Sequence, residues 1–218
     1  MPGRTIEDRL REEYFDLLPD IRRVGLQLEA ETKYHTLPIL QKLTEYEQLV
    51  VRSRVKDCES AIKALRRRQE GRTFDPDKPE EYSVLNLPDL AGARVLVFPQ
   101  IRLIEIDDLL RGRDSFTRWA SDPVKDGDGT VLALKYNGYF EKVSEKVRAE
   151  YQVVPMLIGL FWEVEHSAIY KPALSLKGIA ESEEIKKLKT DVERALSHFE
   201  AGFESFVREN IEPPSEAS

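Results

Sequence analysis

The sequence is poor in the features that mark exported or membrane-bound proteins. Its 218 residues include a single cysteine, Cys58, which excludes a disulfide bond within the chain and is typical of a reducing compartment. No stretch approaches the roughly 20 consecutive apolar residues that a membrane helix needs. The opening residues MPGRTIEDRL contain no apolar segment typical of a signal peptide. We therefore expect a cytoplasmic protein without a membrane anchor.

Acidic residues outnumber basic ones overall, but one segment is rich in positive charge. The net charge of −7 argues against broad, nonspecific binding of nucleic acid, DNA included. Between Arg52 and Arg72, eight basic residues stand against three acidic ones, so this basic segment carries a charge of +5. Such a segment in an acidic chain predicts a compact polyanionic ligand such as a nucleoside triphosphate. A solvated helix face is the alternative interpretation.

The apolar content of 41% suits one domain with a real core. Apolar periodicity predicts a helix that begins at Thr5, which Pro19 would kink or divide, and a second helix over residues 37–45. The last helix is the clearest, because apolar residues recur every three or four positions from Ile185 to Phe206.

The middle of the chain alternates between strand and helix patterns. Residues 46–56 are β-like, and Asp57 is a natural cap for a helix that ends at Gly71. The charged, proline-rich residues 75–82 predict a loop. The apolar run 93–98 predicts a strand that is buried on both faces.

A further helix, a loop and a hairpin follow. We expect a helix over 101–110, a turn or loop over 122–129, and a hairpin with strands at 130–143 and 147–154. Pro155 then begins a helix. The residues expected on its apolar face are Leu157, Phe161, Val164 and Ala168. The whole order predicts a mixed α+β domain with a small sheet and flanking helices.

Four clusters of residues carry candidate chemistry, and the first lies in the basic segment. Arg54 and Lys56 share one face of a strand end, because side chains two apart point the same way. Ser60, Lys63 and Arg67 fall near one face of the next helix. The two sets could converge on phosphates, with the free N–H groups of the helix N-terminus beside them.

The second cluster surrounds the start of the apolar strand. Asp89 precedes it, Gly92 permits a close approach to the backbone, and Arg94 follows. An acidic residue at a strand boundary is a common Mg²⁺ ligand, but it is also a common turn residue. The sequence alone leaves both interpretations of Asp89 open.

The third cluster contains the dipeptide Asn137-Gly138, which is a strong hairpin-turn signal. The functional interpretation has Tyr139 present its ring to a base, with Lys135 and Asn137 supplying polar contacts. Stacking of a base on an aromatic ring contributes about 1–3 kcal/mol in single-strand binding proteins.

The fourth cluster joins a strand to the following helix. Glu150 and Gln152 share a strand face, and Glu163, His166 and Tyr170 recur at spacings of three and four on the helix. A lone helix histidine is usually structural, and that interpretation of His166 stays open.

Taken in order, the clusters R-x-K-x3-S-x2-K, D-x2-G-x-R, K-x-N-G-Y, E-x-Q and E-H-x3-Y-K resemble the RelA/SpoT synthetase domain. The resemblance covers residues 46–171, and the flanking segments are similar to those of small alarmone synthetases. It implies a nucleotidyltransferase-like α+β fold with a mixed sheet of about five strands. Helices over 1–45 and 172–210 would extend this fold, and 211–218 would be a polar tail.

The resemblance also implies an activity. Enzymes of this family act in the stringent response, where they transfer pyrophosphate from ATP to the 3′-hydroxyl of GTP or GDP, make (p)ppGpp and release AMP. Carried over by motif, Arg54 and Arg94 would enclose the adenine. The residues that would meet the ATP phosphates are Lys56, Ser60 and Lys63.

The same resemblance implies a metal and an acceptor site. Asp89 and Glu150 would hold Mg²⁺, and Glu150 would help to activate the attacking hydroxyl. Tyr139 would stack on guanine, and His166 would lie at the edge of the pocket. The remaining acceptor-side residues implied by the resemblance are Lys135, Asn137 and Gln152.

The acceptor side departs from the family pattern, which keeps other functions open. Glu141, Val143, Val154 and Pro155 replace residues that the family usually has there, while the ATP-side residues are intact. The alternatives are a toxin-like pyrophosphokinase that acts on tRNA 3′ ends and an inactive nucleotide-binding sensor. No histidine is followed by aspartate, so the hydrolase motif of long family members is missing. The resemblance further implies a homo-oligomer.

Overall fold

The computed structural model describes residues 5–68, 82–125, 129, 131–166 and 182–210. The first half of the described chain contains α1 (Ile6–Leu40), β1 (Gln48–Val55), α2 (Cys58–Arg68), the short 3₁₀ helix η2 (Val84–Asn86), β2 (Ala91–Phe98) and α3 (Arg102–Arg111). The second half contains β3 (Ala120–Ser121), β4 (Val124–Lys125), β5 (Val131–Tyr139), β6 (Arg148–Pro155), α4 (Met156–Glu165) and α6 (Glu183–Asn210).

The strands of the described residues form one mixed sheet. Its order is β1-β2-β6-β5-β3, and β4 pairs with β5 beside this path. Strands β2 and β6 are parallel, whereas β1–β2 and β5–β6 are antiparallel. The α+β class and the mixed sheet of about five strands flanked by helices are therefore confirmed.

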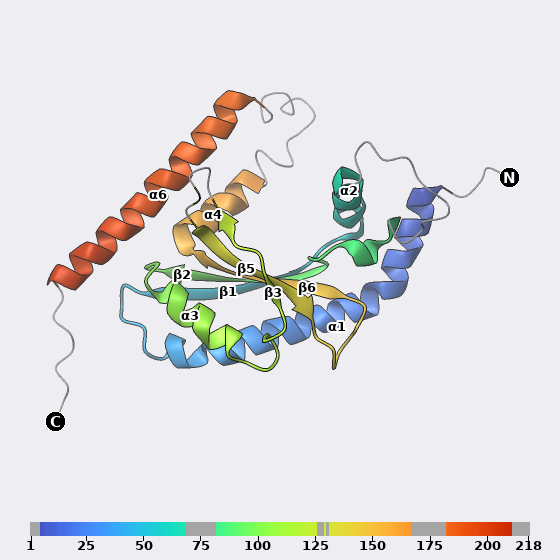
Figure 1. Ribbon diagram of the computed structural model, residues 1–218, viewed down its shortest axis with the longest axis horizontal. Helices are drawn as coiled ribbons and strands as arrows, with labels where there is room; N and C mark the ends of the chain where they lie inside the picture. Colours follow the sequence, from blue (N-terminus) through green and yellow to red (C-terminus); the bar gives the residue numbers. More distant parts are fainter. Residues whose placement is uncertain (1–4, 69–81, 126–128, 130, 167–181, 211–218) are drawn as a thin grey trace.

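The two faces of the sheet are covered unequally. Helices α1 and α3 lie on one face, where Ile21, Leu28 and Ile106 pack with Val95 and Tyr151 of the strands to form the main core (Figure 1). On the other face, α4 covers only one end of the sheet, around Leu96, Val154 and Ile158 of a smaller apolar cluster. The rest of this second face carries the polar side chains described below.

Helix α1 corrects the prediction of two N-terminal helices. It runs unbroken for 35 residues with Pro19 and Pro38 inside it. Its start agrees with the prediction, because Thr5 and Asp8 form a capping box. A proline inside a helix costs about 3 kcal/mol, but each large apolar side chain that α1 buries on the sheet recovers about 1.5–3 kcal/mol.

Three further segments differ in detail from the predictions. Strand β2 is buried on both faces only in its second half, since Gly92 and Arg94 face the polar side. The expected loop 122–129 contains the short strand β4. Helix α4 buries Met156, Ile158 and Gly159 rather than the predicted face, and Val164 is 63% exposed. The sequence periodicity failed there because α4 contacts the sheet through its first turn.

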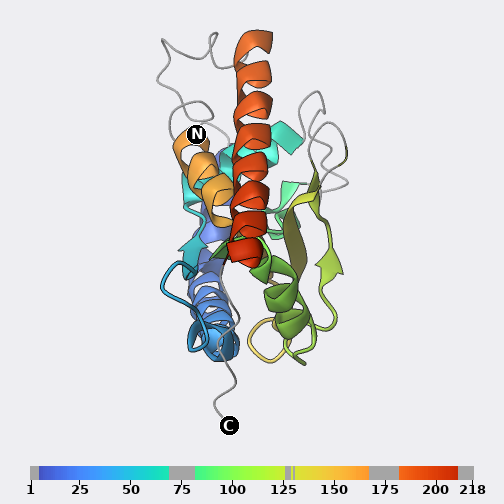
Figure 2. The same ribbon diagram turned by 90° about the vertical axis from the view of Figure 1, so that its left-hand side faces the viewer.

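Helix α6 confirms the predicted C-terminal helix and runs beside α4 (Figures 1 and 2). Its apolar stripe is partly open to solvent, with Leu188, Phe199 and Phe206 all more than half exposed. The homo-oligomer remains a prediction. Within the described ranges, no helix has both the length and the apolar character needed to cross a membrane. Outside the described residues lie Arg72, the predicted helix end at Gly71, the loop from residue 75, Ala168, Tyr170 and the polar tail.

Candidate active site on the polar face of the sheet

The strand register collects the predicted residues on one face of the sheet. Arg54 of β1 lies opposite Gly92 of β2, which lies opposite Glu150 of β6, which lies opposite Asn137 of β5. Directly paired residues point to the same side, as do residues two positions apart. The second row on this face therefore consists of Arg52, Arg94, Gln152 and Lys135.

The alternation of each strand explains this arrangement. In β2 the residues Ala91, Ala93 and Val95 point into the core under α1, so Gly92 and Arg94 must point the other way. The same alternation holds in β6, where Tyr151 is fully buried in the core between the polar Glu150 and Gln152. Core packing thus fixes which face the polar side chains take.

Asp89 lies beside two cations at the edge of this face. The Lys56 N–H donates to the Leu90 carbonyl at 2.9 Å, which holds the end of β1 against the start of β2. Lys56 Nζ lies 2.7 Å from Asp89 Oδ2, and Arg54 Nη2 lies 3.5 Å from the same oxygen. The other carboxylate oxygen, Oδ1, is buried and has no hydrogen-bond partner among the described residues. Asp89 therefore has an oxygen available to a ligand.

Glu150 is the most perturbed acid on the polar face. Burial raises the pKa of its carboxyl, and the negative charge of Asp89 raises the pKa further. Gln152 Nε2 donates to Glu150 Oε1 at 2.7 Å, and Arg94 Nε donates to Gln152 Oε1 at 2.9 Å. A buried carboxyl with a raised pKa that is held by a neighbouring amide is suited to accept a proton during a reaction.

The pair of Asp89 and Glu150 has the chemistry that Mg²⁺ requires. This ion is usually held by one or two carboxylates together with substrate phosphates, rather than by a complete protein cage. Within the described ranges no group of three or more histidine, cysteine, aspartate or glutamate residues could hold a metal alone. The unpartnered Asp89 oxygen and the electrostatic coupling of the two carboxyls fit an ion that is completed by a nucleotide.

The basic segment is divided between the site and the packing of α2. Asp57 Oδ1 accepts from the Ser60 N–H at 2.9 Å, which confirms Asp57 as the cap and places Ser60 in the first turn. Lys63 lies one turn later and is exposed. The phosphate roles of Ser60 and Lys63 remain predictions.

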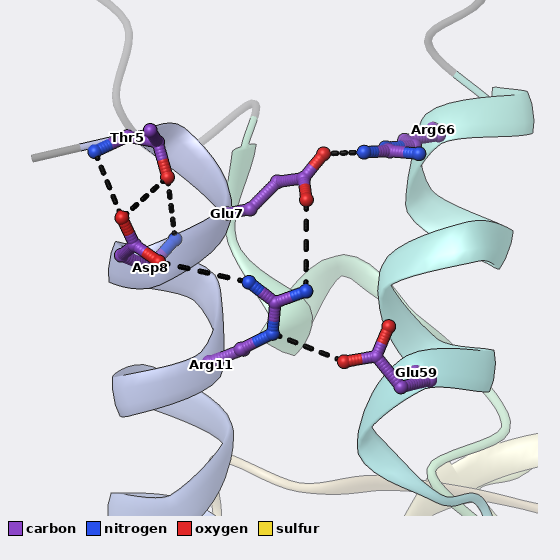
Figure 3. Close-up of polar contacts among 6 residues, drawn as sticks. All are labelled: Thr5, Glu7, Asp8, Arg11, Glu59 and Arg66. Carbon is purple, nitrogen blue, oxygen red and sulfur yellow. Dashed lines mark hydrogen bonds and ion pairs between the residues drawn. The ribbon is translucent and has the colours of Figure 1, made fainter.

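Other charges of α2 attach it to α1. Arg66 forms an ion pair with Glu7, and Arg11 Nε lies 3.0 Å from Glu59 Oε1 (Figure 3). Arg66 therefore contributes its charge to the contact between α2 and α1. Arg54 and Lys56 lie instead on the polar face beside Asp89.

Three of the predicted acceptor-side residues, Lys135, Asn137 and Tyr139, lie along β5. Asn137 and Gly138 are inside this strand, so the hairpin-turn interpretation is wrong. Asn137 Oδ1 is buried without a hydrogen-bond partner among the described residues. Lys135 Nζ forms an ion pair with Asp122. Tyr139 is 41% exposed at the end of the strand, so its ring is accessible to a base.

Four residues of this face were given no role in the site by the sequence, although Glu163 belongs to the fourth cluster. The Arg148 guanidinium lies 5.8 Å from the centre of the Tyr139 ring, and the Arg94 guanidinium lies 5.9 Å from the Trp162 ring. The other two, Arg52 and Glu163, form an ion pair between β1 and α4. Only strand register and helix docking bring these residues together, although Arg52 belongs to the basic segment. His166 ends α4, and its backbone N–H donates to carbonyls within that helix.

Of the comparisons with known proteins, only the one with solved structures found a match. No protein-family model matches the sequence, and no curated protein is significantly similar to it. Solved structures do match, and they show that the chain has the RelA/SpoT-type synthetase fold of the small alarmone synthetases.

Three of these structures illustrate the extent of the similarity. Small alarmone synthetase 1 from Bacillus subtilis bound to its product pppGpp is 17% identical, with a TM-score of 0.65 over 92% of this chain and 100% of that one. The same enzyme bound to AMPCPP is 15% identical, with a TM-score of 0.59 over 91% and 99%. A GTP pyrophosphokinase family protein from Streptococcus pneumoniae is 21% identical, with a TM-score of 0.57 over 93% and 98%.

Proposed function

We propose that this chain is an ATP-dependent nucleotide pyrophosphokinase that transfers pyrophosphate from ATP to the 3′-hydroxyl of GTP or GDP. The observation that carries the proposal is the coupled carboxyl pair of Glu150 and Asp89 on a sheet face that is otherwise rich in cations. Similarity to structures bound to AMPCPP and pppGpp supports it. The proposal includes a cytoplasmic location and a role in the stringent response.

The donor nucleotide would occupy the side of the face formed by β1 and β2. Arg54 and Arg94 would enclose the adenine, since planar guanidinium groups stack on aromatic rings. Lys56 would exchange its ion pair with Asp89 for contact with the ATP phosphates, and Ser60 and Lys63 would extend this contact along α2. Fixed cations of this kind stabilise the charge that develops during phosphoryl transfer.

The acceptor would lie along β5 with its base on the Tyr139 ring. Glu150 would accept the proton of the 3′-hydroxyl, whose oxygen forms a bond to the β-phosphorus of ATP. The bond between that phosphorus and the oxygen of the α-phosphate breaks, and AMP leaves with the electron pair. Lys135, Asn137 and Gln152 would hold the acceptor in place, with His166 at the edge of the pocket.

We propose Mg²⁺ as the cofactor, with Asp89 and Glu150 as its protein ligands. When bound, the ion would neutralise charge on the phosphates and acidify the attacking hydroxyl. Lys56 could then leave Asp89 without exposing an uncompensated carboxylate.

A second acceptor, the 3′ end of tRNA, is favoured by one observation. Tyr139 and Arg148 lie at the outer end of the β5–β6 pair, where the tyrosine ring is 41% exposed. An accessible ring at the end of a strand would admit the terminal base of a polynucleotide as well as a free nucleotide.

The test is transfer of label from γ-labelled ATP with GDP, GTP or bulk tRNA as acceptor. We expect label in the guanosine nucleotides and a fall in turnover of on the order of 100-fold or more for Glu150→Gln. Glu145→Gln, an exposed change in the segment before β6, is the matched control and should leave turnover unchanged.

Label on tRNA alone would show that the acceptor is the 3′ end of tRNA and not a free guanosine nucleotide. Full turnover by Glu150→Gln would remove the assigned base. ATP binding without transfer to any acceptor would leave the nucleotide-sensor interpretation.

A further inference from the structure

Trp162 of α4 lies next to the guanidinium group of Arg94 in the proposed donor site. Its ring centre lies 5.9 Å from the guanidinium carbon of Arg94, within the range of a cation–π contact. Arg94 is also held at its edge, since its Nε donates to Gln152 at 2.9 Å. The Arg94 guanidinium is thus held by an aromatic ring and by a side-chain amide.

The indole is itself fixed by the C-terminal helix. Trp162 Nε1 donates to Glu193 Oε1 of α6 at 2.7 Å, and Glu193 is only 7% exposed. Lys189 of α6 is next to this contact, with its Nζ 3.1 Å from Glu165 of α4 and 3.9 Å from Glu193. A partly buried indole whose N–H donates to a charged acceptor is restricted in its orientation.

Helix α6 is attached to α4 at a second point. Glu200 of α6 is fully buried and accepts from the Leu157 N–H at 3.1 Å, at the N-terminus of α4. Leu196 packs between these contacts against the smaller apolar cluster. In Figure 1 and Figure 2, α6 accordingly runs alongside α4.

A continuous series of contacts therefore joins α6 to the proposed catalytic carboxyl. It runs from Glu193 to Trp162, to Arg94, to Gln152 and to Glu150, with hydrogen bonds of 2.7, 2.9 and 2.7 Å and one ring contact. Burial lowers the pKa of Arg94, and the positive charge of Arg54 lowers it further. Because the two guanidinium groups repel one another, the contacts of Arg94 with Trp162 and Gln152 would help to hold it beside a base.

We propose that Trp162 is a positioning residue for the donor nucleotide, and that α6, through Glu193, orients the indole so that Arg94 presents its guanidinium plane to the adenine. The inference rests on the proposed function, because it takes ATP as the donor. It assigns a role in the site to a helix that packs on α4.

The experiment measures binding of AMPCPP by calorimetry, together with KM and kcat for ATP and for GDP. Trp162→Phe keeps a ring but loses the N–H, and Glu193→Ala removes the acceptor. Both should weaken AMPCPP binding and raise the KM for ATP by on the order of three- to tenfold, with the KM for GDP unchanged. Glu193→Gln keeps an acceptor oxygen and should restore wild-type affinity.

Glu184→Ala, an exposed change in the first turn of α6, is the matched control and should bind as wild type does. Unchanged AMPCPP affinity in Trp162→Phe and Glu193→Ala would overturn the inference and leave the proposed function standing. Equal losses for ATP and GDP, or no rescue by Glu193→Gln, would show a merely structural role and overturn it as well. Failure of the wild-type protein to bind AMPCPP would remove the proposed function and this inference with it.

Discussion

Gly92 occupies the middle of the proposed site, between Arg54 on β1 and Glu150 on β6. A Cβ atom there would lie 3.7 Å from the Glu150 carbonyl oxygen and 3.8 Å from the Arg54 side chain, which is ordinary van der Waals contact. The fold therefore tolerates a side chain at this position. We infer that a nucleotide on the polar face would occupy the space left by the missing side chain of Gly92.

Gly92→Ala should accordingly weaken nucleotide binding without lowering the stability of the fold. We expect the midpoint of thermal unfolding to stay close to that of the wild type, because the added methyl group meets no clash. The affinity for AMPCPP should fall several-fold, because the methyl group takes room on the floor of the site. Calorimetry and a thermal melt of the same sample measure both quantities.

Gly202→Ala provides the comparison, since a Cβ at this site in α6 meets nothing within 4 Å. It should raise stability by up to about 1 kcal/mol, as alanine does in an exposed helix, without any effect on nucleotide binding. Wild-type affinity in Gly92→Ala would place the ligand elsewhere on the face.

Among the secondary-structure elements, β5 shows how tertiary pairing overrides a local signal. Asn-Gly favours a tight turn, yet Asn137 pairs with Glu150 and Gly138 with Ala149 in the sheet. Gly138 is needed for a packing reason, because a Cβ there would lie 2.3 Å from the Trp119 ring. Nothing within the dipeptide indicates that ring, which lies 19 residues earlier in the chain.

The contact between α4 and α6 predicts a pH dependence of stability. Burial raises the pKa of Glu200 to about 7, although the Leu157 N–H lowers it in part. Below about pH 4.5 the carboxyl is protonated in both the folded and the unfolded chain, and burial then carries no ionisation penalty. As the pH rises toward 7, the unfolded chain releases this proton and the folded chain retains it, so stability falls.

Glu200→Gln should remove this fall. Between about pH 5 and about pH 8, the free energy of unfolding of the wild type should decrease by roughly 2–3 kcal/mol relative to the variant. Urea titrations at a series of pH values measure the difference. Parallel profiles for the two proteins would show that Glu200 ionises over the same pH range in the folded and the unfolded chain, and would contradict the raised pKa.

At the scale of the whole molecule, one face of the sheet forms the core and the other carries the candidate site. One face packs the main core under α1 and α3, and the other presents residues from β1, β2, β6 and β5 in two rows. The sequence predicted Arg54, Asp89, Glu150 and Asn137 because their motifs occur in a specific order. The register then explains how residues nearly 100 positions apart meet.

The remainder of the site could not be read from the sequence, for physical reasons. Trp162 acquires its place only when α4 docks on the sheet, and Glu193 only when α6 docks on α4. Both steps depend on long-range packing, which leaves no local pattern. The unbroken α1 was missed for a related cause, since burial along the sheet outweighs the local effect of Pro19.

The central claim is transfer to a 3′-hydroxyl, and the most direct measurement compares GDP with 3′-deoxy-GDP as acceptor in the presence of Mg²⁺ and ATP. Phosphorus NMR of the products identifies the new bond, and chromatography measures the amount of AMP. The account predicts equal amounts of AMP and a guanosine nucleotide with a 3′-diphosphate from GDP, and neither product from 3′-deoxy-GDP. AMP formation that does not depend on the 3′-hydroxyl, or no guanosine product at all, would contradict it.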